Sequence, residues 1–250
     1  MSTQITLKNL TKSFGRKHVL RGVDLIAPAG QNTVIIGESG SGKSVLLKCI
    51  LGLVKPDAGE VLLDGQPADR DRDAFLARFG MLFQGAALFD SLTVWENVGF
   101  RLVRGKNKLS RSDARDVAVE KLRRVGLSAD VADQFPAELS GGMQKRVGLA
   151  RAIAADPQII FFDEPTTGLD PIMAGVINDL IREITAEIGA TGMTITHDMT
   201  SVRAIADQVA MLHDGKIRWI GPADQMDTCG DPYVEQFVTG SADGPIEAVR

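Results

Sequence analysis

The sequence predicts an α/β fold in which helices cover a mostly parallel sheet. Short apolar runs alternate with helix-forming stretches, an arrangement typical of parallel strands connected by helices. The run Gln158–Phe162 is almost entirely apolar, as expected of a strand buried on both faces. A glycine-rich segment, Gly37–Ser44, lies between the apolar run Val34–Ile36 and the helix-like stretch Val45–Leu51. This order indicates a strand, a tight turn and a helix.

The other elements follow from local patterns. Alternating apolar and polar residues predict two strands near the N-terminus, Ile5–Leu10 and Val19–Ile26. We expect a turn at Asp57–Glu60 and a charged surface segment at residues 67–78. Residues 92–127 are rich in helix formers and predict a helical subdomain inserted into the α/β core. Further strands are expected at Val61–Leu63, Gly80–Phe83, Met193–Thr196 and Val209–His213, and long helices at Met143–Ala155 and Ile172–Ile188.

Composition narrows the class of protein. The 250 residues carry a formal net charge of −4, which argues against nucleic acid as the main partner. No apolar run reaches the roughly 18–20 residues that span a bilayer, and the N-terminus lacks the pattern of a secretory signal. The cysteines Cys49 and Cys229 form no disulfide framework, and Cys49 is expected to be a buried hydrophobic residue. A reducing cytoplasm is the simplest compartment.

The segment Gly37–Ser44 reads G-E-S-G-S-G-K-S and fits the phosphate-binding pattern G-x-x-x-x-G-K-[ST]. Its glycines allow the backbone N–H groups to approach an anion at a helix N-terminus. The Lys43 ammonium can reach the terminal phosphates, and the Ser44 hydroxyl can bind Mg²⁺. The alternative is a flexible Gly/Ser loop. We expect nucleotide contacts from Gly37, Ser39, Gly40, Ser41, Gly42, Lys43, Ser44 and Val45.

The second motif, Ile160–Glu164, is acidic and lies at the end of a predicted buried strand. Strand ends are where an α/β sheet presents groups to a ligand. Asp163 would hold Mg²⁺ through water, alongside Ser44. Glu164 could accept a proton from the attacking water. Alternatively, both carboxylates are solvated charges at a strand end.

A third motif, Leu139–Arg146, reads L-S-G-G-M-Q-K-R. Ser140 is a candidate N-cap, and Gly141 and Gly142 leave the backbone N–H groups of the helix start accessible. This makes a second anion site, although one nucleotide does not easily need two such sites from one subunit. The motif therefore predicts a head-to-tail dimer in which each copy closes on the other's nucleotide. An ordinary glycine-containing helix cap is the alternative.

The order of these motifs resembles that of ABC-transporter ATPase subunits. Gln84 follows the phosphate loop, and the segments Gly168-Leu169-Asp170 and Thr196-His197 follow the acidic motif, so the resemblance covers residues 4–221. It implies the ABC ATPase fold: a P-loop NTPase core, an N-terminal antiparallel β subdomain and an inserted helical subdomain at about residues 86–156 of a domain spanning 1–239. It also implies two composite sites for ATP and Mg²⁺ in a homodimer.

The resemblance implies roles for individual residues. Gln84 would bind Mg²⁺ with Ser44 and Asp163, sense the attacking water and link the site to a transmembrane partner. Asp170 would contact the opposite subunit. His197 would bridge Glu164 and the γ-phosphate.

Phe14 and the three histidines each carry an expectation of their own. Phe14 occupies the place where the family often stacks a tyrosine on adenine, and its ring keeps the π-face. It could instead be a core residue. His197 could be an ordinary loop histidine. The remaining histidines, His18 and His213, are expected to be structural.

A narrower resemblance concerns the segments Phe83–Val98, Asp170–Gly175 and Phe237–Ile246. These are similar to the ATPase of Mla-type, Mce-associated phospholipid transport systems, which maintain outer-membrane lipid asymmetry. The resemblance implies a peripheral ATPase on the cytoplasmic face of the inner membrane. Its partners would be a permease, a periplasmic Mce-domain lipid binder and a small STAS-domain protein. Residues 240–250 would form a C-terminal tail that reaches the partner ATPase, and the alternative for Ala242–Pro245 is a solvated polar turn.

Residues Leu88–Val94 would carry motion to a helix of the permease. Phe89, Leu92 and Trp95 are candidate apolar anchors there, or core residues.

Two other functions compete with lipid transport. One is the ATPase of a small-molecule importer. The other is a soluble ABC-type ATPase acting on nucleic acid or the ribosome, which the acidic balance and the short stretch between Gln84 and Ser140 disfavour. A scaffold with a weakened site is disfavoured by Lys43, Asp163 and Glu164.

Overall fold

The computed structural model describes residues 2–104 and 108–246. The chain divides into two compact units. The terminal unit contains residues 3–72 and 193–250, and the middle unit contains residues 1–2 and 73–192. Residues 105–107 of the predicted helical subdomain and 247–250 of the predicted tail lie outside the described residues.

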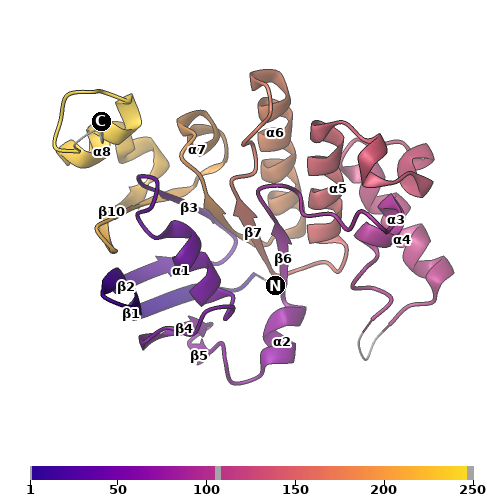
Figure 1. Cartoon of the computed structure of the whole chain (residues 1–250), viewed down its shortest axis with the longest axis horizontal. Coiled ribbons are helices and arrows are strands. Elements are labelled where there is room, and N and C mark those ends of the chain that lie inside the picture. Colours follow the sequence, from indigo (N-terminus) through magenta and orange to yellow (C-terminus); the bar gives the residue numbers. More distant parts are fainter. Residues whose placement is uncertain (1, 105–107, 247–250) are drawn as a thin grey trace. The chain divides into compact units, whose positions relative to one another are not determined.

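The N-terminal part of the terminal unit is an antiparallel sheet of order β2-β1-β4-β5 (Figure 1). Its strands are β1 (Ile5–Phe14), β2 (Lys17–Ala27), β4 (Ala58–Leu63) and β5 (Gln66–Pro67). Ile5 and Leu7 of β1 are buried, as their alternation predicts. A register shift between Leu7 and Leu10 allows Leu10 to be buried as well. The prediction of a turn at Asp57–Glu60 is wrong from Ala58 onward. These residues belong to strand β4, in which Ala58 and Glu60 pair with β1.

The terminal unit also holds the strands that lead to the phosphate loop. Strand β3 (Asn32–Ile36) is fully buried and pairs in parallel with β9 (Gln208–His213). On the other side of β9, β10 (Lys216–Pro222) pairs antiparallel. The helices of this unit are α1 (Lys43–Ile50), α7 (Met199–Ile205) and α8 (Pro232–Thr239), with a 3₁₀ helix at Ala223–Thr228. Strand β10 and helices α7 and α8 were not predicted from the sequence.

The middle unit is built on two parallel strands, β6 (Phe79–Leu82) and β7 (Ile159–Asp163). The first four residues of β7 are completely buried, as predicted for a strand covered on both faces. Helix α5 (Gly141–Ile153) packs against β6 so closely that a Cβ on Gly80 would lie 1.9 Å from the Ala152 carbonyl oxygen. Only glycine fits at that contact.

The remaining helices of the middle unit are α2 (Arg72–Ala77), α3 (Val94–Val98), α4 (Arg111–Arg124) and α6 (Pro171–Ile188). The prediction that residues 67–78 lie on the surface is wrong at Phe75, which is buried. Its ring centroid lies 5.1 Å from that of Phe79. Strand β8 (Thr191–Ile195) carries the chain from the middle unit into the terminal unit. None of the helices within residues 2–104 and 108–246 has both the length and the apolar character to cross a bilayer.

Candidate functional site

The phosphate loop follows the buried strand β3 in the terminal unit. Gly37 has φ 147°, and a Cβ there would lie 2.3 Å from the Leu212 carbonyl oxygen of β9. The loop backbone therefore lies directly against β9, which excludes any side chain at this position. Helix α1 begins at Lys43, after Gly42 in a left-handed conformation.

The Lys43 side chain is folded into this loop. It is 8% exposed, and its Nζ donates to the carbonyl oxygens of Gly37 at 2.6 Å and Glu38 at 2.8 Å. Ser39, Gly40 and Ser44 are exposed, and Val45 is half-buried. The loop thus holds a cation beside backbone and hydroxyl groups that are open to a ligand.

One polar atom of the loop has no partner. The Ser41 Oγ is buried and makes no hydrogen bond to any described residue. Since a buried hydroxyl without a partner is unfavourable, this position suits a ligand oxygen such as that of a phosphate. The residues present therefore fit a nucleotide phosphate.

Phe14 and His197 belong to the same terminal unit. Phe14 ends β1 and is 51% exposed, so it is available for stacking and is not a core residue. His197 is exposed and follows β8. Its neighbour Thr196 donates its backbone N–H to the Ile35 carbonyl of β3 at 3.4 Å. His197 is therefore held at the end of β3 from which the phosphate loop departs.

The acidic pair lies in the middle unit. Asp163 is the last residue of β7, and Glu164 follows it with φ 47°. A left-handed backbone is uncommon for residues other than glycine, and such residues are often found at functional sites. The Glu164 Oε2 accepts a hydrogen bond from the Thr167 hydroxyl at 3.1 Å.

Lys145 of α5 connects three of the predicted motifs within the middle unit. Its Nζ donates to the backbone carbonyls of Gln84 and Glu164. Burial lowers the pKa of the Lys145 ammonium below its usual value, while the charges of Asp163 and Glu164 oppose that shift. The Lys145 ammonium is thus a largely buried cation that connects α5, where the third motif lies, to the backbone of Glu164.

Arg151, six residues further along α5, holds the segment that follows Gln84. Its guanidinium donates to the carbonyls of Ala86 at 2.6 Å and Ala87 at 2.7 Å. Both alanines have positive φ, 58° and 49°. The arginine therefore supports an unfavourable backbone conformation, a role for which the local sequence carries no signal.

The third motif begins α5 as expected. Ser140 is the N-cap, and its Oγ accepts a hydrogen bond from the Met143 N–H at 3.3 Å. Gly141 is exposed, and a Cβ on it would meet nothing within 4 Å. A Cβ on Gly142 would lie 2.7 Å from the Met173 Cε. The start of this helix is therefore open at Gly141.

Asp170 has a local role that the sequence reasoning did not assign. Its Oδ1 accepts hydrogen bonds from the N–H groups of Ile172 and Met173, each at 3.0 Å, and so caps α6. Asp170 is also exposed, which leaves its predicted contact with a second subunit as a prediction.

The predicted site residues are thus divided between the units. The terminal unit holds Phe14, the phosphate loop and His197; the middle unit holds Gln84, Ser140, Gly141, Gly142, Asp163, Glu164 and Asp170. His213, which we expected to be structural, contacts the phosphate loop through Glu38.

Within the described residues, no group of three or more His, Cys, Asp or Glu side chains could hold a metal ion. The proposed Mg²⁺ ligands include a hydroxyl and an amide as well as one carboxylate.

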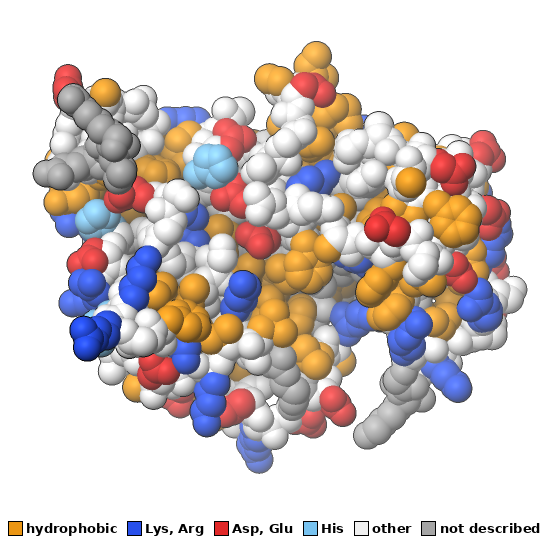
Figure 2. Space-filling model, viewed as in Figure 1, with side chains coloured by type: hydrophobic (Ala, Val, Ile, Leu, Met, Phe, Trp, Pro, Cys, Tyr) orange, Lys and Arg blue, Asp and Glu red, His pale blue; other side chains and the backbone are white. Residues whose placement is uncertain are grey.

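An apolar surface lies around α3 in the middle unit. Phe89 is 44% exposed, and its ring is stacked on that of Phe100 with centroids 4.6 Å apart. Trp95 is buried, as the core alternative for that residue predicts. Hydrophobic side chains are visible at the surface over α3 and α4 (Figure 2). A small cavity of about 40 Å³ is lined here by Leu92, Trp95, Glu96, Gly99, Val103, Arg104 and Arg111.

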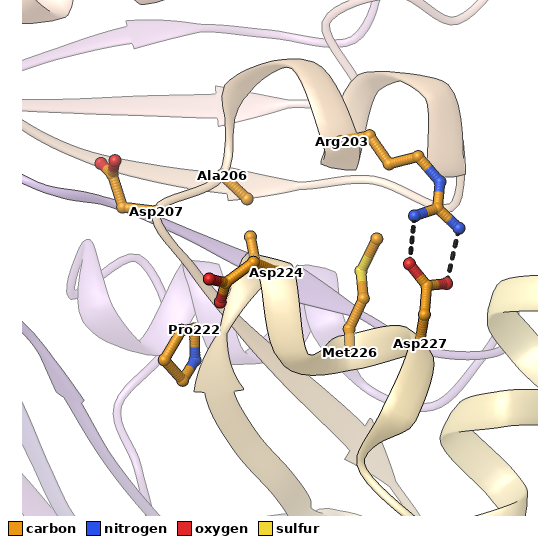
Figure 3. A pocket seen from close by; sticks show the side chains of 8 residues that line it. Arg203, Ala206, Asp207, Pro222, Asp224, Met226 and Asp227 are labelled. Atoms are coloured by element: carbon orange, nitrogen blue, oxygen red, sulfur yellow. Dashed lines mark hydrogen bonds and ion pairs between the residues drawn. The ribbon is translucent and has the colours of Figure 1, made fainter.

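An open pocket of about 570 Å³ lies elsewhere in the terminal unit, between the end of α7 and the 3₁₀ helix that follows β10 (Figure 3). Two hydrogen bonds join the Arg203 guanidinium to the Asp227 carboxylate across it, at 2.5 Å and 2.7 Å. Its lining includes none of the predicted nucleotide-binding residues.

Comparisons with known proteins agree with this geometry. The family model described as "ABC transporter" matches residues 20–167. The chain is 42% identical over 250 residues to the probable ribonucleotide transport ATP-binding protein mkl of Mycobacterium leprae, covering 98% of this chain and 72% of that relative. It is 40% identical over 246 residues to the intermembrane phospholipid transport system ATP-binding protein MlaF of Haemophilus influenzae, covering 97% and 92%. A solved dimeric ATP-binding cassette, bound to ADP and Pi in a post-hydrolysis state, is similar with a TM-score of 0.77 and 35% identity, covering 88% of this chain and 98% of that one.

Proposed function

The chain belongs to the ABC transporter family of ATPases, and we propose that it hydrolyses ATP to power phospholipid transport through a membrane permease. The observation that carries this proposal is the similarity to MlaF, which extends over 97% of the chain and 92% of that relative. The predicted fold class and family resemblance are both confirmed by the comparisons. The similarity to mkl supports a second candidate cargo, a ribonucleotide.

The phosphate loop supplies the groups for nucleotide binding. The Lys43 ammonium would exchange its contacts with the Gly37 and Glu38 carbonyls for the terminal phosphates of ATP. The Ser41 hydroxyl would gain the partner that it lacks. Phe14 would stack on the adenine. Bound Mg²⁺ would neutralise phosphate charge, with Ser44, Gln84 and Asp163 as its proposed protein ligands.

Glu164 is the proposed general base. Its carboxylate would take a proton from the water that attacks the γ-phosphorus, while the bond from that phosphorus to the ADP oxygen breaks. His197 would hold the γ-phosphate and orient Glu164. Gln84 would position the same water, supported from α5 by Lys145.

We propose that a second copy of the chain completes each site. The N-cap Ser140 and the open Gly141 leave the start of α5 accessible to a phosphate of the partner's nucleotide. Asp170 would contact that partner. Hydrolysis removes the shared anion and so weakens the closed dimer. The dimeric state of the similar cassette supports this arrangement.

The apolar surface around α3 is the proposed docking site for a cytoplasmic helix of the permease. The stacked Phe89 and Phe100 rings offer an exposed apolar contact. The Asn97 side chain holds this segment by hydrogen bonds with the backbone of Phe89, Leu92 and Thr93. A helix that presses on this surface would act on the segment following Gln84, which connects the permease to the ATP site.

This assembly would be peripheral on the cytoplasmic face of the inner membrane. An Mce-domain lipid binder and a STAS-domain protein are further proposed partners, and the C-terminal tail is a candidate interface. The supporting observations are the similarity to MlaF and the tail residues Phe237–Ile246.

The test is purification of the chain from native membranes with its partners, followed by reconstitution in vesicles that contain a fluorescent phospholipid. We expect a permease and an Mce-domain protein to co-purify, and lipid transfer to require ATP. The same complex carrying Glu164→Gln should not transfer lipid. Transfer of a radiolabelled ribonucleotide, with no movement of the phospholipid, would overturn the lipid assignment in favour of the second candidate.

A further inference from the structure

The phosphate loop is connected by side chains to the end of strand β9. The His213 Nδ1 lies 2.9 Å from Oε1 of Glu38, the second residue of the loop. The preceding β9 residue, Leu212, brings its carbonyl oxygen against Gly37. Both the backbone and a side chain of β9 therefore contact the start of the loop.

The His213 ring also contacts the C-terminal helix α8. Its centroid lies 4.7 Å from that of Tyr233, with the ring planes at 54°. The Arg218 guanidinium lies over the Tyr233 ring at 3.7 Å, and its Nε is 3.0 Å from Asp231 Oδ1. Asp231 is the N-cap of α8. Tyr233 is thus fixed in place, and it in turn restricts the His213 ring.

The far end of α8 holds the C-terminal segment. The Gln236 side chain donates to the carbonyls of Ser241 and Ile246, at 3.2 Å and 3.1 Å, and accepts from the Ile246 N–H at 2.7 Å. A Cβ on Gly244 would lie 2.4 Å from the Gln236 Cδ, so the segment is packed directly on α8. A force on residues 241–246 would therefore act on the helix that carries Tyr233.

We propose that Glu38, His213 and Tyr233 form a positioning link through which the C-terminal helix sets the affinity of the phosphate loop for ATP. The Glu38 side chain, held by His213, fixes the backbone next to Gly37, where the loop begins. Without His213, the Glu38 side chain can change rotamer and the loop is less ordered before ATP binds. The conformational entropy of ordering the loop is then lost during binding, which weakens the affinity for ATP. The inference rests on the ATP binding proposed above and is independent of the cargo.

The test is a double-mutant cycle on the purified full-length chain with Mg·ATP. We expect His213→Ala and Glu38→Ala each to raise the Kd for ATP about 3–10-fold, since each removes the same hydrogen bond. The double variant should be no weaker than either single variant. Turnover at saturating ATP should change far less than the Kd, which separates positioning of the loop from loss of fold.

Two further variants connect the effect to α8. Tyr233→Ala should raise the Kd for ATP in the same way. Tyr233→Phe keeps the ring and should have the Kd of the unmodified chain. The matched control is Asp214→Asn, which breaks an exposed ion pair with Arg21 beside His213 and should leave the Kd unchanged. Independent, additive effects of His213→Ala and Glu38→Ala would overturn the link, as would an unchanged Kd in both. If the unmodified chain does not bind ATP, that result would instead refute the proposed function.

Discussion

Lys145 Nζ lies 3.3 Å from the backbone carbonyl oxygen of Glu164 and donates a hydrogen bond to it. The same ammonium donates to the carbonyl of Gln84. One side chain of α5 therefore supports the backbone of the proposed general base and that of the residue proposed to position water. Movement of α5 would displace both.

Lys145→Met should lower kcat for ATP about ten-fold with little change in the Kd for ATP. Methionine fills similar space but cannot donate, so the backbone of Glu164 and Gln84 loses its support while the phosphate loop is untouched. Steady-state hydrolysis and equilibrium ATP binding measure the two quantities. Lys145→Arg, which keeps the charge and the donors, should recover part of kcat. A lower ATP affinity at unchanged kcat would contradict this role.

The titration of Lys145 gives a pH prediction. Its pKa in the folded chain lies below the usual 10.5, chiefly because of burial. Between the folded-state value and 10.5 the unfolded chain binds more protons, so the free energy of unfolding rises with pH there. Denaturant unfolding across the alkaline range should show the stability of the unmodified chain rising relative to Lys145→Met. A constant difference between the two would contradict the assignment.

Gly141→Ala separates a contact with a second copy from effects within the chain. A Cβ here meets nothing within 4 Å, and alanine favours the helix by about 0.5–1 kcal/mol. The variant should therefore be at least as stable as the parent, yet lose ATP-dependent dimerisation and most turnover, because in the proposed dimer the added methyl group would face the partner's nucleotide. The matched control is Gly175→Ala in α6, which is equally unobstructed and should keep both activities. Full turnover by Gly141→Ala would argue against the head-to-tail site.

Glu164→Gln should reduce turnover at least about 100-fold while ATP binding is retained. Glutamine preserves the shape of the side chain but cannot accept the proton, so the nucleotide should persist and hold the proposed dimer closed. Light scattering with and without Mg·ATP measures the association, and phosphate release measures the turnover. Glu183→Gln, an exposed glutamate of α6, should behave as the parent. Hydrolysis at the parental rate by Glu164→Gln would show that another group acts as the base.

Asn97→Ala should lower the free energy of unfolding by about 2–4 kcal/mol. The Asn97 side chain is 0% exposed; it accepts from the Phe89 N–H and donates to the carbonyls of Phe89, Leu92 and Thr93. Alanine leaves these backbone groups without that partner. Urea unfolding measures the change. As control, Arg111→Ala breaks the ion pair between the exposed Arg111 and the half-buried Glu96, which keeps its hydrogen bonds from Thr93, and should cost less than about 1 kcal/mol.

Local patterns predicted most of the elements because the spacing of their apolar residues matches the period of a helix or of a strand. The helix expected at Ile172–Ile188 begins one residue earlier, where Asp170 caps it, and ends at the same residue. The edge strand β10 was missed because its residues are exposed or half-buried and show no apolar run. Helix α8 was missed because it is only eight residues long, too short for a clear helical period.

The phosphate loop, the acidic pair and the glycines at the start of α5 could all be predicted from the amino-acid sequence, because each is a short motif whose chemistry depends on adjacent residues. The distant side chains that support these motifs are visible only in the folded chain. Glu38 and His213 are 175 positions apart, and Arg151 and Ala86 are 65 apart. No periodicity encodes such pairs, because they meet only where strands β3 and β9, or α5 and the segment after β6, are packed side by side.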